Sequence, residues 1–177
     1  MLTDQRYGLV SAGEELPNPS TVVRYVGLGQ METDGDQNVL GPAPAAFEGR
    51  AIDTYLSVTW CEYFIGNPDA QLRCAIEAIR RSMNVKTKAC FCVARTDQLF
   101  EAGRGFGRAA RAVFHPEENN RAHSGIYDLA PHDLEAITPE ENKLLGVLAR
   151  EAWSRFFTRE TANTLPQSEC AKSPDVA

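Results

Sequence analysis

The stretch FHPEENNRAHSGIYDL contains two of the three histidines of the chain, His115 and His123. Imidazole titrates near neutral pH, so two such rings can serve as general base and general acid in one reaction. Glu117 or Glu118, between them, could orient one ring. We therefore treat His115 and His123 as candidate catalytic residues.

The neighbouring polar residues allow other interpretations. Asn120 and Ser124 are candidate substrate-binding residues, and Ser124 would be a nucleophile only if a base reached it. Equally, HPEENNRA could be a polar turn between two strands, because His-Pro opens a turn and Asn119 tolerates left-handed geometry. A metal site would need a third ligand, either a glutamate of the stretch or the distant His132. No familiar ligand spacing supports it, so no metal is predicted.

A second candidate site is the glycine-rich stretch AGRGFGRAAR, which includes Arg104 and Arg108. Backbone N–H groups and guanidinium groups suit a phosphate or another anion, so both arginines are candidate substrate-binding residues. The stretch lacks the glycine spacing of a dinucleotide-binding fingerprint and the Lys-Ser/Thr ending of a P-loop. It predicts no cofactor, and the alternative is a flexible connection with solvated arginines.

A third candidate is DTYLSVTWCEYF, in which Asp53 and Glu62 bracket an apolar segment. A carboxyl group buried among aromatic rings can have a raised pKa and take part in catalysis, so Glu62 is included as a candidate catalytic residue. The alternative is that the aromatic side chains form core and the carboxylates are solvated or cap the ends.

Composition limits the class of protein. The 177 residues carry a formal net charge of −6, which argues against binding along bulk nucleic acid or an anionic membrane. No apolar run reaches the roughly 20 residues of a membrane span, and the N-terminal residues do not resemble a secretory signal. The five cysteines show no C-x-x-C spacing, so we predict reduced thiols and a cytoplasmic location, with Cys170 exposed.

Two helices are indicated by their caps. Asn67 and Pro68 begin an amphipathic segment that runs to about Met83. Thr138, with a glutamate three positions later, forms a predicted capping box. The helix that it begins should present one apolar face, made by Leu145, Leu148, Ala149, Ala152, Trp153 and Phe156.

Strands are predicted at 21–28, 54–60, 85–95, before His115 and at 124–129, with a short helix near 97–103. This order predicts an α+β fold with a mixed or antiparallel sheet and helices packed on one side. We expect a single domain over residues 1–160. Residues 161–177 lack periodicity and are predicted to form a disordered tail.

Two stretches resemble a set of small bacterial proteins with an LSVxWxEYF segment and an HP…NxxHSGI segment. The resemblance covers roughly residues 45–129, about half of the chain, and rests on Leu56, Ser57, Val58, Trp60, Glu62, Tyr63, Phe64, His115, Asn120, His123, Ser124 and Gly125. That set has no established activity or fold, so the resemblance implies no mechanism. It implies a bacterial cytoplasmic protein associated with a toxin or defence system.

Two functions follow as hypotheses. The first is a binding or accessory module that contacts a protein partner, since the connection 29–50 is long and no catalytic motif is recognised. The second is a small hydrolase or transferase acting on a nucleotide or phosphodiester. In it His115 and His123 would be acid and base, and Arg104 and Arg108 would hold the anion.

Overall fold

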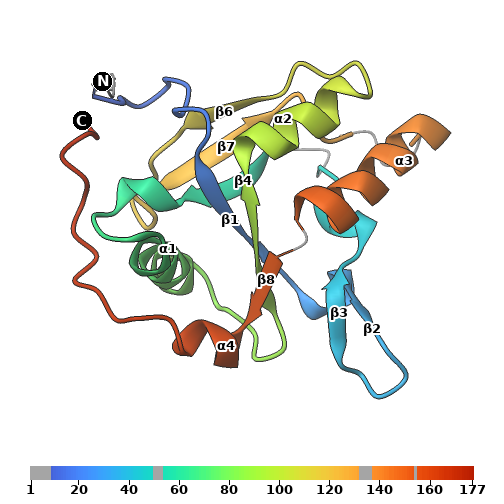
Figure 1. Cartoon of the computed structure of the whole chain (residues 1–177), viewed down its shortest axis with the longest axis horizontal. Coiled ribbons are helices and arrows are strands. Elements are labelled where there is room, and N and C mark those ends of the chain that lie inside the picture. The colour runs from blue at the N-terminus through green and yellow to red at the C-terminus, as the bar shows by residue number, and fades with distance from the viewer. Residues whose placement is uncertain (1–8, 50–53, 132–136, 154) are drawn as a thin grey trace, which may run out of the picture.

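The computed structural model describes residues 9–49, 54–131, 137–153 and 155–177. Six antiparallel strands form one sheet in the order β6-β7-β4-β1-β5-β8 (Figure 1). Their bounds are β1 Thr21–Val26, β4 Tyr55–Trp60, β5 Cys90–Arg95, β6 Arg111–Phe114, β7 His123–Tyr127 and β8 Arg155–Thr158. The predicted α+β class is therefore confirmed, with the antiparallel form of the sheet.

Helices cover both faces of this sheet, which corrects the expectation that they pack on one side. The helices are α1 Pro68–Ser82, α2 Thr96–Arg104, α3 Pro139–Val147 and α4 Arg159–Asn163, and a π-helical turn, Leu148–Ala152, follows α3. Two successive residues of β1 point to the two faces of the sheet. Val22 packs in one core with α2 and α3, and Val23 packs in a second core with α1. Two faces are covered because the inner strands are apolar on both sides.

The first helix forms as its caps predict. The Asn67 side chain accepts a hydrogen bond from the Ala70 backbone N–H at 2.9 Å. Leu72, Ile76 and Ile79 are buried along one face, where each contributes about 1.5–3 kcal/mol by leaving water. This face of α1 therefore forms one wall over the sheet.

The helix predicted from Thr138 begins with the expected capping box but ends earlier than expected. Its apolar stripe continues only to Trp153, which is fully buried and stacks on Phe47 with ring centroids 5.3 Å apart. Phe156, assigned to the helix from its spacing, lies instead in β8, opposite Cys92. The open edge of β5 supplies backbone partners there, and tertiary pairing overrides a helical period.

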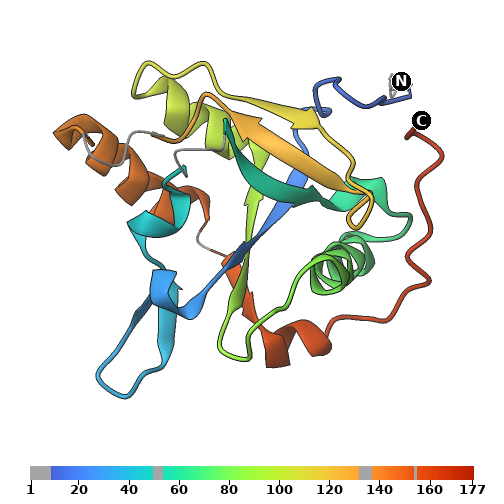
Figure 2. The same cartoon turned by 180° about the vertical axis from the view of Figure 1, so that it is seen from behind.

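A small hairpin projects away from the main sheet (Figures 1 and 2). It consists of β2, Met31–Thr33, and β3, Val39–Pro42, within the connection that showed no regular structure in the sequence. Asp34 closes its turn by accepting hydrogen bonds from the backbone N–H groups of Asp36 at 2.9 Å and Asn38 at 2.8 Å. The long connection is therefore an ordered projection.

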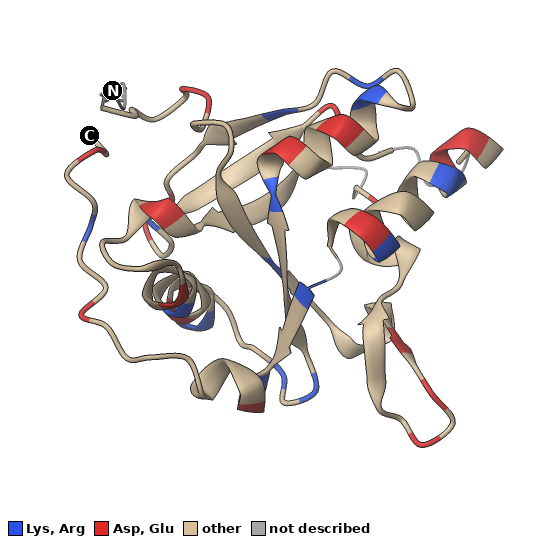
Figure 3. Cartoon of the chain, in the orientation of Figure 1, with Lys and Arg blue, Asp and Glu red and all other residues tan. Residues whose placement is uncertain are grey.

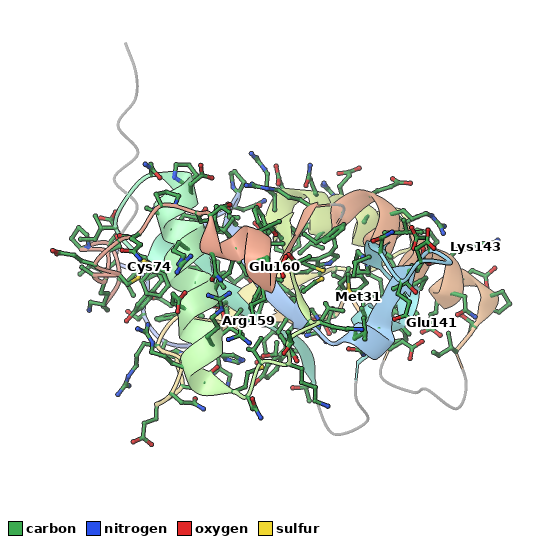
Figure 4. All side chains as sticks on the ribbon, turned by 90° about the horizontal axis from the view of Figure 1, so that it is seen from below. Met31, Cys74, Glu141, Lys143, Arg159 and Glu160 are labelled. Atoms are coloured by element: carbon green, nitrogen blue, oxygen red, sulfur yellow. A yellow bond between two sulfur atoms is a disulfide. The ribbon has the colours of Figure 1, made fainter. Side chains whose placement is uncertain are left out.

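The C-terminal segment is also ordered, which corrects the predicted disordered tail. Cys170 forms a disulfide with Cys74 of α1, with the Cα atoms 5.2 Å apart (Figure 4). Ser173 N–H donates to the Tyr63 carbonyl at 2.7 Å, and Val176 is buried. The prediction of an exposed, free Cys170 is therefore wrong, because the helix face that it reaches is far away in sequence.

Candidate functional site

Both histidines lie at the base of the turn that joins β6 to β7. The His115 N–H donates to the His123 carbonyl at 3.0 Å, and the Glu117 N–H donates to the Asn120 carbonyl at 3.0 Å. These bonds close the turn and bring the two imidazole centroids to 6.1 Å from each other. His115 is exposed, whereas the His123 residue is only 5% exposed. The two rings therefore have different surroundings.

His123 is held at both ring nitrogens. Its Nδ1 lies 2.8 Å from the carbonyl oxygen of His115, and its Nε2 lies 2.7 Å from Oγ of Ser57. A carbonyl oxygen can only accept, so the proton of the neutral ring is on Nδ1. Nε2 is then an acceptor, and the Ser57 hydroxyl donates to it. This is the arrangement in which an imidazole can remove a hydroxyl proton.

A carboxylate stands beside the same ring. Oε1 of Glu117 is 3.5 Å from Nδ1 of His123, and the Glu117 side chain is 46% exposed. When Nε2 gains a proton the ring becomes a cation, and a carboxylate at this distance stabilises that cation. Ser57 and His123 thus resemble a nucleophile and a base, with the His115 carbonyl positioning the ring and Glu117 adding a negative charge beside it.

Ser57 is accessible because β1 and β4 separate beside it. These strands pair only at Val22↔Trp60 and Val23↔Thr59. Past that point the Arg24 guanidinium spans the gap, donating to the Ser57 carbonyl at 2.9 Å and to the Ala46 carbonyl at 3.1 Å. The separation leaves a cavity of ≈ 390 Å³, and both Ser57 and His123 line it.

The aromatic ring of Tyr55 fixes the histidines from one side. Its centroid lies 5.8 Å from that of His115 and 5.8 Å from that of His123, both in edge-on geometry. Tyr55 in turn covers Gly125, where a Cβ atom would lie 2.7 Å from the Tyr55 ring. A glycine at this position of β7 therefore lets the ring sit close to the sheet.

Asn120 and Ser124 have structural surroundings. The Asn120 amide donates to Oγ1 of Thr59 at 2.8 Å and its oxygen accepts from the Ala122 N–H at 3.2 Å. Asn120 lines the cavity, yet these two bonds fix it as part of the turn. Ser124 is fully buried on the opposite face of β7 from His123, so it is not at this site.

Glu62 lies away from the histidines. Its carboxylate accepts from the Thr21 N–H at 2.9 and 3.0 Å, at the start of β1. Burial raises the pKa of this carboxyl, partly offset by the hydrogen bonds from Thr21. The expected raised pKa is present, but the group supports a strand end. Asp53, the other carboxylate proposed from the sequence, lies outside the described residues.

The two arginines of the glycine-rich bend do not join the histidines. Arg104 pairs with Glu101, and Arg108 pairs with Glu141 at 2.7 Å. The bend precedes β6 and His115 follows it, so a strand of four residues, about 13 Å long, separates them. The expected shared anion site is therefore not formed: Arg104 and Arg108 line one cavity, and His123 lines another.

Within the described ranges, no three His, Cys, Asp or Glu side chains gather closely enough to ligate a metal ion. His132, the distant ligand considered above, falls outside those ranges. Every helix that the structure describes is too short or too polar to cross a lipid bilayer.

Sequence reasoning missed Ser57, Arg24 and Tyr55 as members of this site. The available signal was the alternation of Tyr55, Ser57 and Thr59, which places three polar groups on one face of a buried strand. The partner of that face cannot be read from the strand itself.

Comparison with protein-family models, curated proteins and solved structures finds no match for this chain.

Proposed function

We propose that this protein is a small hydrolase or transferase in which Ser57 is the nucleophile and His123 is the base. The observation that carries the proposal is the 2.7 Å contact between Ser57 Oγ and His123 Nε2 at an open cavity. The fixed Nδ1–H tautomer supports it, since only that tautomer leaves Nε2 free to accept.

The proposed reaction has two steps, transfer of a group to Ser57 and its release from Ser57. Ser57 Oγ attacks the electrophilic carbon or phosphorus of an ester or amide while its proton passes to His123 Nε2. The bond to the leaving group breaks, and the leaving group takes that proton. Water or a second acceptor then attacks the Ser57 adduct and gives its proton to Nε2, which returns it to Ser57 Oγ.

A fluorophosphonate probe, which reacts with activated serines, tests the proposal. We expect one adduct by intact mass and its position at Ser57 by peptide mapping. Ser57→Ala and His123→Ala should abolish labelling with unchanged circular dichroism. Ser124→Ala is the matched control and should label like the wild type. Labelling that persists in Ser57→Ala, or no labelling of the folded wild type, would overturn the assignment.

A second candidate, a module that binds a protein partner, is favoured by the β2–β3 hairpin. Its acidic residues Glu32, Asp34 and Asp36 are exposed, with no basic residue on the hairpin (Figure 3). Leu40 is 62% exposed on the same projection. An ordered acidic arm with an exposed apolar side chain suits a basic protein surface, and the resemblance stated above suggests a toxin or defence partner.

This second candidate predicts a defined interaction. Leu40→Ser and Asp36→Lys should each weaken binding of a purified basic partner, measured by calorimetry, and added salt should weaken it further. Ser57→Ala should bind that partner as the wild type does. Binding that survives both hairpin changes would exclude this surface.

The Cys74–Cys170 disulfide is unusual for the cytoplasmic location expected from the sequence. Reducing compartments keep most thiols unpaired. We infer that the protein works in an oxidising compartment. Acid quenching of cells followed by alkylation should then show two blocked cysteines and three free ones, whereas five free thiols would restore the cytoplasmic location.

A further inference from the structure

The charges around the Ser57 cavity limit the substrate. Its described lining carries one positive side chain, Arg24, and two negative ones, Glu48 and Glu117. Arg24 is already directed at two backbone carbonyls. An incoming anion would therefore enter a space that holds more negative than positive charge, and this charge balance disfavours its binding.

The groups that would hold a phosphate lie elsewhere. Arg108 is paired with Glu141 and Arg104 with Glu101, and neither lines the Ser57 cavity. Recognition of a phosphoryl group usually relies on arginine forks or several N–H donors directed at its oxygens. No second arginine stands at this cavity among the residues that the structure describes.

The walls of the Ser57 cavity favour an uncharged or cationic ligand over a phosphate. Tyr25 and Tyr55 both line the cavity, with Met83 on the α1 side. Tyrosine rings attract cations through their negative faces, and carboxylates nearby add to that attraction. A volume of ≈ 390 Å³ is at the small end of ligand sites. The space therefore suits a small molecule that is uncharged or positively charged.

We infer that Ser57 takes the acyl group of small carboxylic esters or thioesters whose leaving group is uncharged or, preferentially, carries an ammonium group, and that phosphoesters are not substrates. This inference rests on the proposed Ser57 nucleophile. It names the substrate class of that site, and it replaces the nucleotide or phosphodiester expected from the sequence.

Three thioesters with one acyl group test it. Acetylthiocholine is cationic, 3,3-dimethylbutyl thioacetate is its neutral isostere, and S-acetyl-3-mercaptopropionate is anionic. Released thiol gives kcat/KM for each. We expect the cation to exceed the neutral isostere by roughly fivefold and the anion to fall below it, since one close carboxylate in a solvated cleft shifts affinity by about that factor.

Charge variants connect the preference to the cavity. Glu48→Gln should lower the ratio of cation to neutral isostere toward one. Glu118→Gln removes an exposed carboxylate from the same turn as Glu117, outside the lining, and should leave the ratio unchanged. Bis(4-nitrophenyl) phosphate serves as the phosphodiester and should show no turnover that depends on Ser57.

The outcomes separate the two claims. Ser57 labelled by the fluorophosphonate, together with equal or faster turnover of the anion or the phosphodiester, would overturn the substrate class alone. Failure to turn over any of the three thioesters would overturn it as well. Thioester hydrolysis that persists in Ser57→Ala would instead overturn the proposed nucleophile.

Discussion

Ser57 and His123 are 66 positions apart in the sequence, yet Oγ of one lies 2.7 Å from Nε2 of the other. Pairing of β4 with β7 produces this contact, since Ser57 lies opposite Gly125 and His123 lies opposite Thr59. Both side chains therefore project from one face of the sheet as diagonal neighbours. The contact depends on strand register, so it is sensitive to changes in the residues that fix that register.

The two histidines should contribute unequally to activity. His123→Ala removes the base and should lower kcat by about 10²–10⁴-fold. His115→Ala keeps the backbone carbonyl that holds Nδ1 of His123, so kcat should change by no more than about threefold, measured on any Ser57-dependent ester. His115→Ala should retain the wild-type melting profile, whereas His123→Ala should fold but melt at a lower temperature, because the Ser57 hydroxyl and the His115 carbonyl lose their partner. Equal large losses would support an acid–base pair in which both imidazoles exchange protons.

Gly125→Ala should disturb the same site through packing. The new Cβ would meet the Tyr55 ring at 2.7 Å, and overpacking of this kind costs about 1–3 kcal/mol in the free energy of unfolding. Urea denaturation measures it, and the rate of fluorophosphonate labelling should fall as well. Gly41→Ala is the matched control, a strand glycine with no atom within 4 Å of its added Cβ. Equal stability of the two variants would mean that Tyr55 moves aside freely.

The Cys74–Cys170 disulfide should contribute substantially to stability. It links residues 96 positions apart, so its removal restores a large loop to the unfolded chain and should cost about 3–4 kcal/mol. Paired Cys74→Ala and Cys170→Ala substitutions should lower the free energy of unfolding by that amount. Dithiothreitol should destabilise the wild type and leave the double variant unchanged. A wild type indifferent to dithiothreitol would show that the bond contributes nothing.

Glu62 should make stability depend on pH in an unusual direction. Burial raises the pKa of its carboxyl above the ordinary value of 4.5, so the folded chain binds a proton there more tightly than the unfolded chain. Stability contributed by this group is then present below pH 4.5 and is lost as pH rises through the folded pKa.

The comparison of wild type with Glu62→Gln isolates this effect. The free energy of unfolding of the wild type, relative to the variant, should decline as pH rises from about 4.5 through the folded pKa. Glu140→Gln, which removes an exposed carboxylate of α3, is the control for the loss of one negative charge. A relative stability that rises with pH would show that the hydrogen bonds from Thr21 outweigh burial.

Local signals predicted the elements that depend on local chemistry. The Asn67 cap and the Thr138 capping box were both readable, because a cap involves residues three positions apart. Phe156 was misassigned because its place in β8 is decided by the open edge of β5, which no window of sequence contains. Cys170 was misassigned because its partner, Cys74 of α1, is 96 positions away in the sequence.

The candidate site divides in a similar way. His115 and His123 were expected to approach each other, since one short turn joins them, and their rings do lie close together. Arg104 and Arg108 were grouped with them from sequence proximity alone, although a strand intervenes. Ser57 was overlooked because its partner comes from another strand. Proximity in sequence is informative across a turn and uninformative across a strand.

The short pairing of β1 with β4 leaves a seam in the backbone hydrogen bonding of the sheet. Strands β6, β7 and β4 form one half of the sheet and β1, β5 and β8 form the other. The backbones of the two halves pair at Val22↔Trp60 and Val23↔Thr59. Ser57 and His123 belong to the first half and Arg24 to the second. The cavity therefore takes its reactive pair from one half of the sheet and its cation from the other, so a substitution can alter either one without changing the strand that carries the other.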